Sequence, residues 1–395
     1  MVTEQFRPPG FDVGYELPLS REAFRRALRT GHGRVRLHVD RHGAIEVRDE
    51  ILEAATTCQV YDPQVEGLRA DWLAELCVQA EIVDVVVQRV PAGSDWDRHL
   101  RSALLKEFAS RGNDKARAAL YSECVRDGRN LIGSEEIVLL DGEPGLAFVA
   151  RALGKVLGED PDFWVDDYFM ILFDENRGRG TAAKILEERA QGDAAVRRFL
   201  QGVAETKSER RTSATRSSKP RRSGQDVVTA IMAANEKLYG NTYWGRHATP
   251  EELEPIVRIA LSDSQTLAHH VDPSVRAAGL AALVRDLTTA VTLLRLNAVA
   301  EDGEAIVRAL HPLPDPHDQH SVGSDVVQLM EDNGRVREPL LALYVYEHSP
   351  CMNCREKATR FLHEASACPA WLLEEGMQDA SEEVRRLCSS SRGSR

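Results

Sequence analysis

The sequence predicts an all-α protein, built as an irregular stack of amphipathic helices in two lobes. Apolar residues recur at helical spacing through most of the 395 residues, and a short residue pattern recurs between segments. Charged residues make up 28% of the chain. No apolar run approaches the roughly 20 residues that a membrane-spanning helix needs. We therefore expect a helical fold without a membrane partner.

Five apolar stripes predict helices along the chain. Each stripe spaces its apolar residues three, four and seven positions apart, which places them on one helical face. The segments are 20–28, 51–58, 68–78, 145–157 and 336–346. Between the first two, residues 34–39 alternate apolar and polar side chains. A solitary hairpin of this length is marginal, so we assign this segment to a helix as well.

The clearest helix start is at Thr249. Thr249 is a good N-cap residue, Pro250 suits the first helical position, and Glu252 completes a capping box. An apolar stripe follows immediately: Leu253, Ile256, Val257, Ala260 and Leu261. We therefore predict an amphipathic helix from residue 250 onward.

A polar, basic segment at 205–226 divides the chain. Its only apolar residue is one alanine, and it is rich in Ser, Thr, Lys and Arg. Such a composition buries too little apolar surface to offset the entropy of ordering the chain. We expect a disordered linker here, between an N-terminal helical lobe at 1–204 and a C-terminal lobe at 227–395.

One local pattern recurs five times and connects the predicted helices. A buried-type residue is followed by Arg, a small or apolar residue comes four positions after the first, and in all copies but the last another comes eight positions after it. Positions 0, 4 and 8 share one helical face, so each copy can pack against a neighbouring helix. The copies begin at Val47, Val196, Val275, Cys354 and Val384.

Two copies carry a family resemblance. At 272–283 and 379–388, an Asp precedes Val-Arg and a small residue, and this signature resembles HEAT repeats. The segments 61–76, 119–154 and 345–362 resemble parts of uncharacterised bacterial HEAT-like proteins. Seven scattered cysteines indicate a reducing cytoplasm. A curved helical stack offers an extended surface, so we expect a non-catalytic scaffold for a protein partner. The resemblance itself implies an α-solenoid. It implies no reaction and no cofactor, and the chain holds no GxxxxGK[ST], GxSxG or HExxH motif.

Cys351 and Cys354 form a Cys-x-x-Cys motif after Ser349-Pro350. A helix N-terminus lowers thiol pKa values, which suits redox chemistry, and the pair could supply half a zinc site. His348, His363 or Cys368 would then complete the zinc site. The recurring pattern, however, places Cys354 in a buried position, and no βαβ pattern surrounds the motif. We favour packing and assign no metal site, with zinc binding and redox chemistry as alternatives.

Two further segments carry polar side chains of functional types. Residues 314–320 offer two histidines and two carboxylates, which we interpret as turn and capping chemistry rather than a metal site. Residues 160–175 are dense in acids and aromatics. A core stripe is expected here, made of Val165, Tyr168, Phe169 and Leu172. The acids would then form a solvated face, and its functional interpretation is a surface for a basic partner.

Basic residues gather in two islands on an otherwise acidic chain. The formal net charge is −12, but residues 207–222 carry +6 and residues 21–48 carry +5. The candidate polyanion-binding side chains are Arg21, Arg25, Arg29, Arg34 and Arg36. They support the alternative of a nucleic-acid-binding protein, similar in architecture to HEAT-like alkylpurine DNA glycosylases. No catalytic Asp or Trp of that family can be matched in this sequence.

Overall fold

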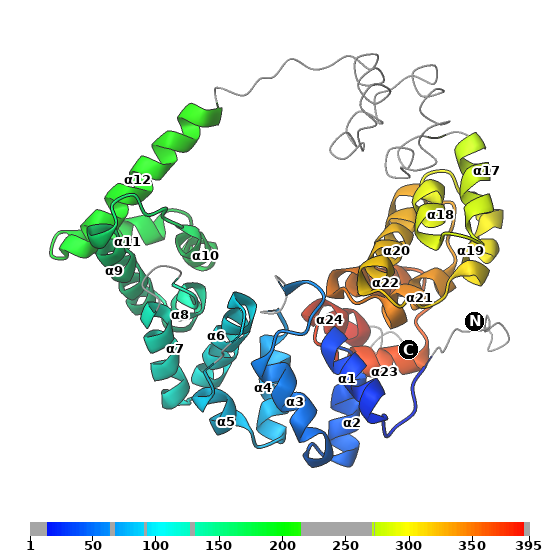
Figure 1. Ribbon diagram of the computed structural model, residues 1–395, viewed down its shortest axis with the longest axis horizontal. Coiled ribbons are helices and arrows are strands. Elements are labelled where there is room, and N and C mark those ends of the chain that lie inside the picture. The colour runs from blue at the N-terminus through cyan, green and yellow to red at the C-terminus, as the bar shows by residue number, and fades with distance from the viewer. Residues whose placement is uncertain are drawn as a thin grey trace. The chain divides into compact units, whose positions relative to one another are not determined.

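The computed structural model describes residues 14–63, 68–90, 93–126, 131–214, 271 and 273–390, and the side chains of all of these except 207–214. These residues form α-helices, short 3₁₀ turns and one π-helical turn, and they contain no strand (Figure 1). The all-α prediction is therefore confirmed for the described part of the chain. None of its helices combines the length and the apolar character that crossing a membrane requires.

The chain divides into two compact units. The first unit comprises residues 1–42, 60–62 and 220–395, so it contains both chain ends. Its described elements are α1 (Arg21–Thr30), α2 (Arg34–His42), α17 (Pro273–Ala282), α18 (Leu287–Leu294), η4 (Ala300–Asp302), α19 (Gly303–Ala309), α20 (Pro316–Gln328), η5 (Leu329–Asn333), α21 (Pro339–His348), α22 (Met352–Glu364), α23 (Ala370–Gly376) and α24 (Glu382–Ser390).

The second unit comprises residues 43–59 and 63–219. Its described elements are η1 (Ile45–Val47), α3 (Arg48–Thr56), α4 (Ala70–Gln79), α5 (Val83–Gln88), α6 (Asp95–Ser110), α7 (Asp114–Arg126), α8 (Ser134–Asp141), α9 (Glu143–Glu159), α10 (Tyr168–Arg177), α11 (Thr181–Ala190) and α12 (Ala194–Ala214). Since α12 continues to Ala214, the first part of the expected linker at 205–226 is helical. The rest of that segment, and the capped helix expected from residue 250, lie outside the described residues.

Local capping explains where the predicted helices begin. The Ser20 hydroxyl accepts the backbone N–H of Ala23, so α1 starts at Arg21. The segment expected at 336–346 becomes helical only from Pro339, because the Glu338 carboxylate caps that end by accepting the N–H of Leu340. Residues 34–39 lie in α2, which confirms their helical assignment.

The recurring pattern buries its first residue and uses its arginine to hold a neighbouring element. Val196, Val275 and Val384 are all at most 1% exposed. The arginines that follow donate to backbone carbonyls or to a carboxylate of a nearby turn. The pairs are Arg48 with the Glu81 carbonyl, Arg197 with the Ala190 carbonyl, Arg276 with the Asp302 carboxylate, and Arg385 with the Asp379 and Ala380 carbonyls. Each copy therefore also ties its helix to the adjoining turn.

The remaining arginine of the pattern, Arg355, connects the α1–α2 turn to the C-terminal helices of the first unit. Arg355 is fully buried, donates to the backbone carbonyls of Thr30 and Gly31, and pairs with Asp379 at 2.8 Å. The Ala380 N–H also donates to the Gly31 carbonyl, at 2.9 Å. Figure 1 shows α1 and α2 beside α23 and α24 within this unit. Residues 14–42 therefore pack with the C-terminal helices.

Candidate functional site

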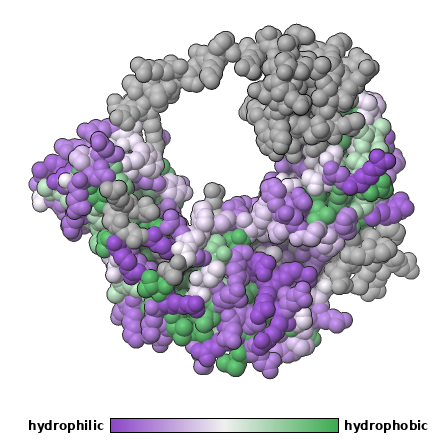
Figure 2. Space-filling model, viewed as in Figure 1, coloured by the Kyte–Doolittle hydropathy of each residue, from purple (hydrophilic) through white to green (hydrophobic). Residues whose placement is uncertain are grey.

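The structure separates the arginines of the N-terminal basic island. Arg21, Arg25 and Arg29 lie on the exposed side of α1, opposite the buried Phe24 and Leu28. Figure 2 shows a hydrophilic surface over α1 and α2 in this view. These three side chains remain accessible to a polyanion.

Arg34 does not belong to that exposed face. It is 6% exposed, donates two hydrogen bonds to Glu347 at 2.7 and 2.6 Å, and donates a third to Glu375 at 2.9 Å. Burial alone would lower the pKa of Arg34, but the Glu375 and Glu347 carboxylates outweigh burial and raise it. Arg36 is half-buried. The spacing of the arginines could not reveal that Arg34 is buried, because the carboxylates that pair with it come from α21 and α23.

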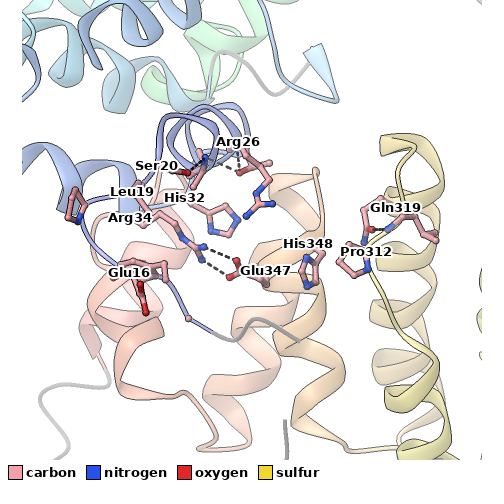
Figure 3. Close-up of a pocket in the computed structure, with 17 residues that line it drawn as sticks. Glu16, Leu19, Ser20, Arg26, His32, Arg34, Pro312, Gln319, Glu347 and His348 are labelled. Atoms are coloured by element: carbon pink, nitrogen blue, oxygen red, sulfur yellow. Dashed lines mark hydrogen bonds and ion pairs between the residues drawn. The ribbon is translucent and has the colours of Figure 1, made fainter. Parts of the chain in front are cut away.

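A cavity of about 810 Å³ lies beside this ion pair in the first unit. Figure 3 shows Arg34 joined to Glu347 in its wall and Arg26 pointing toward it from α1. Burial, then the Arg355 and Arg34 cations, lowers the pKa of His32 well below its usual value. Its neutral ring donates to Glu375 at 2.8 Å. Arg34 pairs with both Glu347 and Glu375, so its charge is compensated within the protein.

A second pocket, of about 360 Å³, lies in the second unit between α6, α8, α9 and α10. Carboxylates and exposed aromatic rings share its rim. We call it the acidic–aromatic pocket and define it by Glu135, Glu136, Asp166, Trp164 and Tyr168. The Trp164 side chain is 58% exposed and the Tyr168 side chain 46%. Large aromatics with this exposure beside several acids are typical of a binding surface.

The start of α10 explains why the aromatic rings face the pocket. The Asp166 carboxylate accepts the N–H of Tyr168 at 3.0 Å, and α10 begins at Tyr168. The helix then buries Phe169 and Phe173. We expected Tyr168 in the core stripe, and this was wrong, because Tyr168 occupies the first helical position and is exposed. Helical periodicity was applied to residues 160–167 as well, but these residues are not helical.

The carboxylates of this pocket repel one another in a partly dry environment. Burial, reinforced by Glu135, raises the pKa of Glu136 to about 7. Burial and then Asp166 raise the pKa of Glu135. A cation in the pocket would relieve this repulsion. The pocket therefore favours a positively charged ligand.

A third cluster brings together two motifs that the sequence analysis treated separately. His320 lies on α20, while Cys351 and Cys354 lie at the N-terminus of α22. One ligand atom from each lies within 4.8 Å of the other two. We call His320, Cys351 and Cys354 the thiol centre. Both cysteines are buried, at 5% and 7% exposed, as the packing interpretation requires, but they also face an imidazole.

The two thiols of the thiol centre have pKa values shifted in opposite directions. Hydrogen bonds from Cys354 and then His320 lower the pKa of the Cys351 thiol to about 4. The hydrogen bond to Cys351 raises the pKa of Cys354, and it likewise raises the pKa of His320. The centre therefore favours a Cys351 thiolate beside an imidazolium. From the sequence we considered His320 only within residues 314–320 and could not join it to the cysteines, because a contact between α20 and α22 brings them together.

No known family model matches this chain, and no curated protein or solved structure is significantly similar to it. The functional argument therefore rests on the geometry of these sites.

Proposed function

We propose that the protein is a non-catalytic helical scaffold that binds a protein partner and holds a basic side chain of that partner in the acidic–aromatic pocket. The observation that carries the proposal is the exposure of Trp164 and Tyr168 beside three carboxylates. A HEAT-like solenoid with lobes at 1–204 and 227–395 is the arrangement we propose for the scaffold. We further propose that it acts in the bacterial cytoplasm.

A lysine or arginine side chain fits the chemistry of the pocket. Its cation can lie over the Trp164 or Tyr168 ring, and such contacts contribute about 0.5–2 kcal/mol depending on desolvation. Its N–H groups can donate to the carboxylates of Glu135, Glu136 and Asp166. Lys106 acts on Glu136, and it is itself paired with Glu107 at 2.5 Å. An exposed arginine of a partner could therefore stack on an aromatic ring and donate to a carboxylate at the same time.

Affinity purification with matched variants tests this proposal. The full chain and its Glu135→Gln/Glu136→Gln variant are used as bait, each with and without nuclease. We expect one dominant protein that survives nuclease and is lost with the variant. Glu187→Gln, which removes an exposed acid from α11, is the control and should retain the partner. Retention of the same protein by the double variant would exclude this pocket as its binding site.

Nucleic-acid binding is the second candidate function, because Arg21, Arg25 and Arg29 stay exposed on one face of α1. Binding through them would weaken steeply between about 50 and 200 mM salt, since phosphate contacts release counterions. Charge reversal of these three arginines should then abolish retention on DNA or RNA columns. Unchanged retention of the reversed variant would rule out this face.

A further inference from the structure

We propose that the thiol centre binds one zinc ion through His320 Nδ1, Cys351 Sγ and Cys354 Sγ. The fourth tetrahedral position is left for a ligand that is not one of these side chains. The proposal rests on the mutual distances, burial and ligand types of the three residues. It is independent of the acidic–aromatic pocket, which belongs to the other unit.

The starts of α20 and α22 bring the three ligand atoms close together. Cys351 is the N-cap residue of α22 and Cys354 follows three positions later, so both thiols lie on one side of the first turn. On α20, Pro316 occupies the first turn and the Asp315 carboxylate caps the helix start by accepting the N–H of His317. His320 follows one turn further on. The capped start of α20 and the first turn of α22 thus supply the three ligands of the thiol centre.

The separations are close to those of a tetrahedral zinc site. Zinc–sulfur and zinc–nitrogen bonds of about 2.3 and 2.0 Å imply ligand atoms about 3.5–3.8 Å apart. His320 Nδ1 lies 4.0 Å from Cys354 Sγ, and all three ligand atoms lie within 4.8 Å of one another. Side-chain rotations alone can close the remaining gap. No backbone rearrangement is needed to complete the three-ligand set.

The ligand types select the metal. Two thiolates and an imidazole suit zinc and other borderline or soft ions, whereas magnesium and calcium require oxygen ligands. Two thiolates also balance the charge of a divalent zinc ion, so the buried site would be neutral. The α22 N-terminus would stabilise the negative charge of both thiolates once zinc has displaced their protons.

The surroundings would hold the ligands in place. The Tyr61 ring lies against the His320 ring with centroids 4.7 Å apart, and the Tyr61 hydroxyl bonds to His317 at 2.8 Å. Ser349, which is 1% exposed, accepts the N–H of Cys351 at 3.2 Å. Such partners around metal ligands fix their orientation and raise affinity. The shell is largely dry, because both thiols are buried.

The number of ligands gives the site an open position. Among the described residues, the ligand group consists of His320, Cys351 and Cys354, and no further His, Cys, Asp or Glu joins it. The residues that sequence spacing suggested as partners, His348, His363 and Cys368, are not part of it. Sites with three protein ligands keep a fourth position for water or an added ligand. A small thiol or anion would therefore exchange at this zinc.

Metal analysis of the full chain tests the proposal. The protein is purified from zinc-supplemented cells without chelator, and its zinc content is measured by mass spectrometry. We expect about one zinc ion per chain. Cys351→Ser, Cys354→Ser and His320→Asn should each weaken binding by about tenfold or more. Cys368→Ser and His363→Asn, which alter the partners suggested by sequence, should bind zinc like the unmodified chain.

Cobalt substitution keeps the test decisive if a ligand variant fails to fold. The chain with cobalt in place of zinc should show thiolate-to-cobalt absorption, and Cys354→Ser should reduce it while helical content by circular dichroism stays constant. Absence of zinc and of this absorption in the unmodified chain would overturn the proposal. So would equal zinc loss in Cys368→Ser.

Discussion

At the scale of single residues, two arginines that are close in the sequence differ in exposure to solvent. Arg29 is exposed on α1, while Arg34, five residues later, is buried between Glu347 and Glu375. Sequence spacing identified both as basic surface candidates, because the carboxylates that pair with Arg34 are more than 300 positions away. The contacts, not the residue type, decide whether an arginine is available to a ligand.

Gly33 gives a residue-scale prediction. A Cβ at this position would lie 1.9 Å from the Glu375 carbonyl oxygen and 2.8 Å from the Asp379 nitrogen, so Gly33→Ala forces the α1–α2 turn away from α23. Overpacking of this kind costs at least about 2 kcal/mol of unfolding free energy. Urea unfolding followed by circular dichroism measures it. Gly192→Ala, where no atom lies within 4 Å, should leave the unfolding free energy nearly unchanged, and an equal loss at both positions would refute the close contact.

At the scale of elements, hydrophobic periodicity predicted α1, α3, α4, α9 and α21 to within a few residues. These helices could be predicted because a buried stripe is local in the sequence, and at α1 and α21 a capping side chain is local as well. The contact between α20 and α22 could not, because nothing in either segment specifies its partner. For the same reason, His320 could not be joined to Cys351 and Cys354 from the sequence.

Arg355 gives the prediction at this scale, because it links α22 to the α1–α2 turn and to Asp379. Both side chains of the pair are 0% exposed. Arg355→Leu would leave Asp379 as a buried, unpaired carboxylate, at a cost of about 3–5 kcal/mol. Thermal or urea unfolding measures the loss.

Arg360 is the matched control, on the same helix but in a solvent-exposed pair with Glu383. Arg360→Leu should change stability little, because exposed ion pairs contribute little. Comparable losses for Arg355→Leu and Arg360→Leu would show that the buried pair does not join these elements.

At the scale of the whole molecule, the net charge of −12 hides two basic islands on a strongly acidic body. In the basic island at residues 21–48, Arg34 forms internal ion pairs and is not part of the exposed basic surface. The structure also locates acidic side chains around the exposed rings of Trp164 and Tyr168. From composition we interpreted the acids of residues 160–175 as a solvated face, with a surface for a basic partner as the functional alternative. The pocket itself could not be predicted, because Glu135 and Glu136 come from α8.

The central claim is that the acidic–aromatic pocket binds a basic side chain, and the pH dependence of peptide binding tests it most directly. Because the pKa of Glu136 is raised to about 7, its carboxyl is mostly protonated at pH 6 and mostly ionised at pH 8. A cation binds the ionised form, so affinity for an arginine-rich peptide should rise by up to about tenfold over this range.

The measurement is a titration of tryptophan fluorescence with that peptide at pH 6 and pH 8. We predict saturable quenching that is tighter at pH 8, is lost in Trp164→Phe, and loses its pH dependence in Glu136→Gln. Quenching that persists in Trp164→Phe with unchanged affinity, or no binding at either pH, would contradict the claim.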